Sequence, residues 1–126
     1  MTAEISPETV MACGIIAIRN ANKTIRIEDV SALFDTLHQR GVEEVGRVAL
    51  RRIPSGFYSE DVEAFFGRLL AGGFADAFSP LAVKEEGMQL CREMVNEEME
   101  SHPEAFRKVA EVLGFDPSLV SSPAPR

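Results

Sequence analysis

Apolar residues at helical spacing dominate the start of the chain. Residues 6–20 open with Ser6-Pro7-Glu8, which supplies an N-cap side chain, a proline suited to the first helical turn and an acid near the positive end of the helix dipole. Apolar side chains then occur almost all round the predicted helix. Such a helix lies either at the centre of the fold or half covered by a second subunit.

Two later stretches carry the most regular apolar stripes. Positions 30, 33, 34 and 37 hold Val, Leu, Phe and Leu, and this i, i+3, i+4, i+7 spacing predicts a helix over residues 28–40 that stops at Gly41. The same spacing recurs from Val62 to Leu70. It predicts another helix, which begins after the N-cap Ser59 and ends at Gly72-Gly73.

Two further helices are predicted in the C-terminal part of the chain. Residues 85–100 place apolar residues on one face and most of six glutamates on the other. Ser101-His102-Pro103-Glu104 has the S-x-x-E form of a capping box. We therefore expect a last helix to start there and to end at Gly114.

The remaining segments are less periodic. Residues 42–52 predict a shorter helix, the third in chain order, which is broken by Pro54-Ser55-Gly56. Residues 24–27 alternate as a short strand would. Between residues 74 and 83 the helical period is lost, which predicts two short strands around Ser79-Pro80. We interpret residues 1–117 as a single domain and residues 118–126 as a flexible Ser/Pro tail.

The order of these elements is the layout of a winged helix, in which the second helix of a helix-turn-helix leads directly into a small β-wing. We therefore expect a mainly α fold with a small β-hairpin. It would consist of a winged-helix-like core with an additional C-terminal helix.

Three motifs within residues 27–95 add to this layout. They are Gly56-Phe57-Tyr58-Ser59-Glu60-Asp61-Val62, Leu69-Leu70-Ala71-Gly72-Gly73-Phe74 and Leu81-Ala82-Val83-Lys84-Glu85-Glu86-Gly87. Together they resemble the YwgA-like group of winged-helix proteins, in which a glycine-aromatic-tyrosine-serine turn caps the second helix of the motif and a wing leads into the next helix. Lys84 stands where that group usually has a capping threonine, and Phe57 stands where proline is common. The group is similar in outline to SocA-like antitoxin and adaptor proteins, so the resemblance implies action through protein contact.

Composition and charge narrow the class of protein. The 126 residues are 45% hydrophobic and 26% charged, which is typical of one packed globular domain. The net charge is −7, which disfavours a polyanionic partner such as DNA. The longest apolar run, residues 10–18, is too short to span a bilayer, and the N-terminus lacks the basic region of a signal peptide. We therefore expect a cytoplasmic protein.

The chain offers little that points to catalysis. Cys13 and Cys91 lie in apolar runs and are expected to be buried reduced thiols, although a disulfide between them stays open. His38 and His102 lie on different predicted helices without a positioned nucleophile. We see no phosphate-binding glycine loop and no zinc-ligand spacing, and the glutamates of residues 85–100 are expected to form a solvated surface. An enzyme is therefore the least favoured class, with no catalytic residue, cofactor or metal expected.

The basic and aromatic residues give the candidate binding surface. Arg47 and Arg51 are four apart and would share one helical face with Arg52 nearby, either to contact phosphates or to pair with neighbouring acids. The would-be recognition helix begins with Glu60, Asp61 and Glu63, which repel phosphate. The pair Phe57-Tyr58 either anchors a partner or packs under the turn. The candidate surface comprises Arg47, Arg51, Arg52, Phe57, Tyr58 and Arg68.

We therefore interpret the chain as a non-enzymatic binding or adaptor module that acts through contact with another protein, with a homodimer as an associated expectation. The main alternative is a winged-helix transcriptional regulator that binds duplex DNA through the three clustered arginines. A hydrolase with an unrecognised site around a histidine is a weaker third hypothesis.

Overall fold

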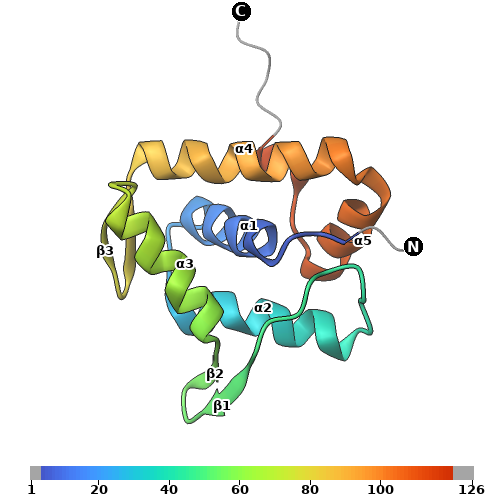
Figure 1. The fold of residues 1–126 in the computed structure, drawn as a ribbon, viewed down its shortest axis with the longest axis horizontal. Coiled ribbons are helices and arrows are strands. Elements are labelled where there is room, and N and C mark those ends of the chain that lie inside the picture. Colours follow the sequence, from blue (N-terminus) through green and yellow to red (C-terminus); the bar gives the residue numbers. More distant parts are fainter. Residues whose placement is uncertain (1–3, 121–126) are drawn as a thin grey trace, which may run out of the picture.

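The computed structural model describes residues 4–120. Its elements in chain order are α1 (Pro7–Asn20), α2 (Ile27–Gln39), β1 (Arg51–Ile53), β2 (Gly56–Tyr58), α3 (Glu60–Ala71), β3 (Ala75–Phe78), β4 (Leu81–Val83), α4 (Glu85–Ser101), α5 (Pro103–Leu113) and a 3₁₀ turn, η1 (Pro117–Leu119). The fold is mainly helical with two small antiparallel hairpins, in a winged-helix-like arrangement (Figure 1). The predicted fold class is therefore confirmed.

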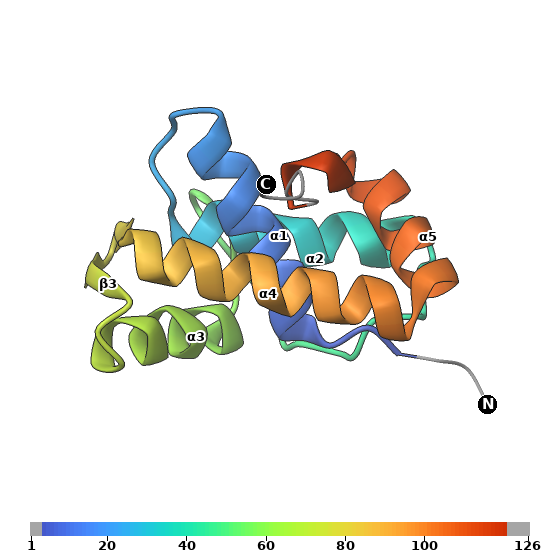
Figure 2. The same ribbon diagram turned by 90° about the horizontal axis from the view of Figure 1, so that it is seen from above.

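Helix α1 lies at the centre of the fold. It runs between α4 and α2, as two perpendicular views show (Figures 1 and 2). Residues 9–16 are all buried, and Ser6 caps the helix by accepting a hydrogen bond from the Glu8 N–H. Of the two alternatives for this apolar helix, the central position is the observed one. Its apolar surface therefore needs no second subunit to cover it.

The helices with regular stripes form as predicted. In α2 the buried side chains include Val30, Phe34 and Leu37. In α3 the stripe is buried up to Leu69, whereas Leu70 is 37% exposed. The spacing of apolar residues therefore predicts which face of each helix points inward, because an apolar stripe has to be buried against other elements for the chain to fold.

The helix predicted over residues 42–52 is wrong. Residues 42–50 form no regular element, Val45 makes a parallel bridge to Ile5, and Arg51 opens strand β1. Pro54-Ser55 is the turn of a hairpin rather than the end of a helix, and Gly56 follows it at φ +136°, a conformation that favours glycine. Pairing with distant residues overrides local helical propensity in this segment.

The strand predicted for residues 24–27 does not form. Ile25 makes a single antiparallel bridge to Leu81, and Ile27 is the first residue of α2. The pair of strands predicted around Ser79-Pro80 is confirmed as β3 and β4, which follow α3 as a wing. Helix α4 then begins close against this wing. An added Cβ on Gly87 would collide with the Phe74 carbonyl oxygen and lie 2.6 Å from Val83 Cγ2.

The predicted capping box does not form. Ser101 is still part of α4, and His102 is the N-cap of α5 without a side-chain capping hydrogen bond. Proline at position 103 sets the boundary, because it fits the first turn of a new helix and does not continue the previous one. Helix α5 ends at Gly114 in the left-handed conformation, as predicted.

The chain stays folded beyond the predicted domain boundary at residue 117. Residues 117–119 form η1, and Val120 is buried, with its carbonyl accepting a hydrogen bond from Asn96 Nδ2 at 3.1 Å. The segment predicted to be a flexible tail is therefore ordered at residues 118–120. Its remaining residues, 121–126, lie outside the described residues.

Both cysteines are buried and free. Cys13 lies on α1 and Cys91 on α4, and burial raises the pKa of each thiol to about 12. At neutral pH both thiols are therefore protonated, and they pack as small apolar side chains.

The contact between α4 and the wing gives a stability test with opposite signs at two glycines. Gly87→Ala is expected to lower the free energy of unfolding by about 2 kcal/mol, because the new methyl group meets backbone that cannot move aside. Gly67→Ala, in the middle of α3 with open space around its Cβ position, is expected to raise it by about 0.5–1 kcal/mol. Urea unfolding of both variants measures the difference, and equal effects would contradict the close α4–wing contact.

Candidate functional site

The hairpin β1–β2 forms an exposed projection at one end of the molecule (Figure 1). Its cross-strand partners are Arg51 with Tyr58 and Arg52 with Phe57. The Arg51 guanidinium carbon lies 4.8 Å from the centroid of the Tyr58 ring, and that of Arg52 lies 5.2 Å from the Phe57 ring. Because neighbouring strand residues point to opposite faces, each face of this arginine–aromatic hairpin (residues 51–58) carries one stacked pair.

The base of the hairpin is fixed to α2. Ser59 follows β2 directly, and its backbone N–H donates a hydrogen bond of 3.0 Å to the Ser31 hydroxyl, with both serines fully buried. The Ser59 hydroxyl in turn accepts from the Asp61 and Val62 N–H groups and so caps α3. Nearer the tip, the Ser55 hydroxyl donates to Glu28 on α2 at 3.3 Å. The hairpin is therefore attached to α2 at its base and at its turn.

The three acids at the start of α3 contact this hairpin or the segment before it. Glu60 forms an ion pair with Arg51 at 3.8 Å, although both side chains are more than half exposed. Asp61 accepts a hydrogen bond from the Ala49 N–H at 3.2 Å. Burial, together with a hydrogen bond to Glu63, raises the pKa of Tyr58. The stacked arginines therefore lie in a surface of mixed charge.

The structure brings four of the six predicted surface residues together, and the other two lie apart. Arg47 is exposed in the irregular segment before β1, so the predicted helical face shared with Arg51 is wrong, because no helix forms there. Arg68 lies in the last turn of α3, at the end opposite the hairpin. There it stacks 5.8 Å from the Phe65 ring and pairs with Glu8 at 3.6 Å.

Tyr58 is half-buried at the junction between β2 and α3. The ring is half-buried and lies under Arg51, and the hydroxyl bonds to Glu63 in the first turn of α3. It therefore helps to fix the start of that helix. Phe57, on the other face, is also half-buried and is covered by Arg52.

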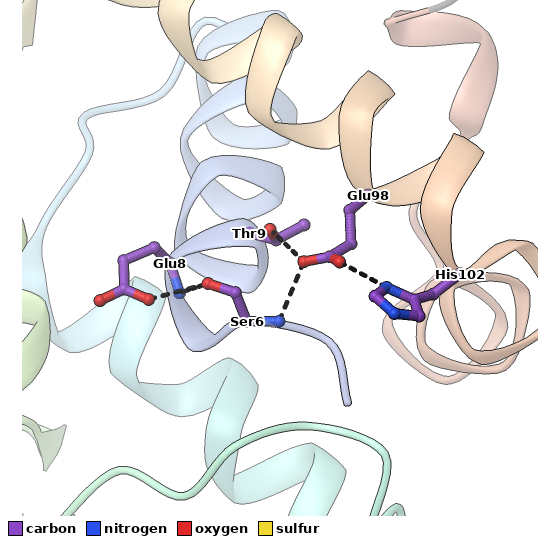
Figure 3. A network of polar contacts seen from close by, with 5 residues as sticks. All are labelled: Ser6, Glu8, Thr9, Glu98 and His102. Carbon is purple, nitrogen blue, oxygen red and sulfur yellow. Dashed lines mark hydrogen bonds and ion pairs between the residues drawn. The ribbon is translucent and has the colours of Figure 1, made fainter. Parts of the chain in front are cut away.

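Sequence reasoning missed a polar network that joins α1, α4 and the start of α5 (Figure 3). One carboxylate oxygen of Glu98 accepts hydrogen bonds from the Ser6 N–H at 3.0 Å and the Thr9 hydroxyl at 2.9 Å. The other accepts from His102 Nδ1 at 2.8 Å. Glu98 was predicted to lie on a solvated surface, but its side chain is only 12% exposed. The i, i+4 spacing of Glu98 and His102 was the one local signal of this contact.

The chemistry of the Glu98 network is structural. Burial alone would raise the pKa of Glu98, but the hydrogen bonds from Ser6, His102 and Thr9 outweigh it and hold the pKa below its ordinary value. The Thr9 hydroxyl donates to Glu98, and the Ser6 hydroxyl donates to Glu8 at 2.8 Å. Both hydroxyls are therefore directed at carboxylates rather than at the imidazole, which is not the arrangement of a base activating a nucleophile.

Residues 4–120 contain neither a cluster of metal ligands nor a membrane-spanning helix. No group of three or more His, Cys, Asp or Glu side chains within this range is placed to hold a metal ion. No helix within it is long and apolar enough to cross a membrane.

Comparison with known protein families, with curated proteins and with solved structures finds no match for this chain. The resemblance to YwgA-like proteins therefore stays a prediction. In the structure, the motif at residues 56–62 spans strand β2, the cap at Ser59 and the first residues of α3.

The Glu98 network makes stability depend on pH with a definite sign. The folded pKa of Glu98 is below the ordinary value of 4.5, so its stabilising effect is fully present above that value and is lost as pH falls through the folded pKa. Glu98→Gln is expected to lower the free energy of unfolding at pH 7 by about 1–3 kcal/mol. In this variant the free energy of unfolding is also expected to fall less steeply as the pH is lowered.

Glu97→Gln, at an exposed position of the same helix, is the matched control and is expected to change stability little. Thermal unfolding from pH 7 down to pH 3 measures both variants. The account of this network is wrong if Glu98→Gln keeps the same stability and acid dependence as the unaltered chain.

Proposed function

We propose that this protein is a non-enzymatic binding or adaptor module that contacts another protein through the arginine–aromatic hairpin. The observation that carries the proposal is the pair of arginine–aromatic stacks, one on each face of an exposed hairpin. A few hot-spot residues carry most of the binding energy at protein interfaces, and arginine, tyrosine and tryptophan are enriched among them. Stacking and the anchorage to α2 reduce the freedom these side chains would lose on binding.

Charge supports a protein partner over a nucleic acid. A guanidinium stacked on a ring keeps its N–H edge free for a carboxylate or a carbonyl of the partner. The neighbouring acids Glu60, Asp61 and Glu63 would repel a phosphate backbone, whereas a protein surface of mixed charge can complement both signs. The net charge of −7 would also repel a nucleic acid at longer range.

A homodimer is one form that this contact can take. The apolar α1 suggested a dimer, but that helix is buried within a single copy. A second copy therefore remains a candidate partner for the hairpin. The proposal places the module in the cytoplasm, in keeping with two free buried cysteines, because reducing compartments preserve thiols.

DNA binding is the alternative function, and Arg51 and Arg52 on the exposed hairpin, with Arg47 shortly before it, are the observation in its favour. We expect no saturable change in fluorescence anisotropy of labelled duplex DNA at about 50 mM salt, where non-specific phosphate contacts are strongest. Binding that Arg51→Glu abolishes would overturn the preference for a protein partner.

The protein-binding proposal is tested by placing a photo-crosslinking phenylalanine analogue at position 57 in the cells that make the protein. Position 78, a half-buried phenylalanine on the other hairpin, is the matched control. We expect a discrete protein adduct from position 57 and none from position 78.

The identified partner is then purified and titrated. Arg52→Ala is expected to weaken its binding about tenfold or more, because the residue combines charge with stacked contact area. Adducts with nucleic acid, adducts from position 78 alone, or a partner whose affinity ignores Arg52→Ala would each contradict the proposal.

A further inference from the structure

A groove with a volume of about 670 Å³ lies between α1, α2 and the end of α5. In Figure 2, α1 and the segment that follows α5 lie on either side of this part of α2. The apolar lining consists mainly of Ala17, Ile18, Ala32, Leu33, Leu113 and Phe115. The volume falls in the range typical of small-molecule sites, which are mostly apolar with a few polar groups at fixed positions.

Small residues keep the groove open. Gly14 and Ala17 on α1 line it from one side, and Ala32 on α2 lines it from another. A Cβ added to Gly14 would lie 2.7 Å from Leu33 Cδ1, the end of a side chain that lines the same groove. The groove is separate from the arginine–aromatic hairpin, none of whose residues line it.

The rim of the groove carries one positively charged side chain that is not paired with an acid among the described residues. Arg26 is neutralised by Asp29 through two hydrogen bonds of 3.0 and 3.2 Å. Lys23 lines the same rim, is exposed, and has no acidic partner among residues 4–120. In a chain of net charge −7, the unpaired charge at this apolar groove is thus positive.

We propose that the groove binds a small apolar molecule that carries a carboxylate. The apolar body occupies the space between Ala17, Leu33 and Leu113, and the carboxylate lies at the rim beside Lys23. Apolar burial supplies the affinity, whereas the ammonium selects an anionic end group over a neutral or cationic one. This binding site does not depend on the protein-binding function proposed for the hairpin.

The test is a titration of the isotope-labelled full chain with decanoate, followed by amide chemical shifts, and a parallel titration with decanol. Decanoate is kept below the concentration at which it forms micelles. We expect saturable shifts concentrated at the groove residues and an affinity for decanoate about fivefold or more above that for decanol. Lys23→Glu is expected to remove this preference and to leave decanol binding unchanged.

Matched variants separate the groove from general effects. Arg107→Glu makes the same change of charge at an exposed position of α5 outside the lining, and it is expected to keep the preference. Ala17→Leu fills the groove and is expected to weaken decanoate at least tenfold, whereas Ala64→Leu on the exposed face of α3 is expected to have no effect. Ala32→Leu replaces Ala17→Leu if the latter disturbs folding.

Three results would overturn the proposal. The first is equal binding of decanoate and decanol, unaffected by Lys23→Glu, since the charge would then select nothing. The second is an absence of shifts at the groove in both titrations. The third is a change of the groove shifts with protein concentration alone, which would assign the groove to a second copy of the chain.

Discussion

A single buried hydrogen bond fixes the junction between the arginine–aromatic hairpin and α3. The Ser59 N–H donates to the Ser31 hydroxyl, which ties the junction between β2 and α3 to the middle of α2. Both serines are fully buried, so removal of the hydroxyl would leave an unsatisfied donor away from water. The side chain of Ser59 also caps α3. The hairpin on one side of this junction and the helix on the other are therefore held in one geometry.

This geometry sets the electrostatics of the exposed hairpin. Because α3 starts directly after β2, its first-turn acids lie next to the arginines that the hairpin presents, and Glu60 pairs with Arg51. A recognition helix with the same shape but neutral or basic residues at these positions would suit phosphate. In this chain those positions hold Glu60, Asp61 and Glu63, and their negative charge supports the proposal of a protein partner. The groove at the end of α5 is a separate feature, shaped by small residues on α1 and α2.

Local patterns predicted the elements whose formation depends on neighbours in sequence. The stripes of α2 and α3, the Ser59 cap and the ends at Gly72 and Gly114 are all of this kind. The helix predicted over residues 42–52 does not form, and the segment from residue 42 to residue 50 is irregular. Its register depends on a bridge from Val45 to Ile5, which local propensity does not report.

The candidate functional residues also differ in how far their partners lie along the sequence, and this decided which of them could be predicted. The composition of the arginine–aromatic hairpin was visible, because Arg51, Arg52, Phe57 and Tyr58 are close in sequence, but the stacking needed the cross-strand register. Glu98 was misplaced on the surface because two of its three partners are 92 and 89 residues away. Burial of a carboxylate becomes predictable only when the distant donors that satisfy it are known.

The most direct test of this account is amide hydrogen exchange in Ser31→Ala, compared with the unaltered chain. If the buried Ser31–Ser59 contact positions the hairpin, the amides of β1, β2 and the first turn of α3 exchange about tenfold faster or more, while those of β3 and β4 keep their rates. Unchanged exchange at β1 and β2, or equal acceleration throughout the molecule, would contradict it.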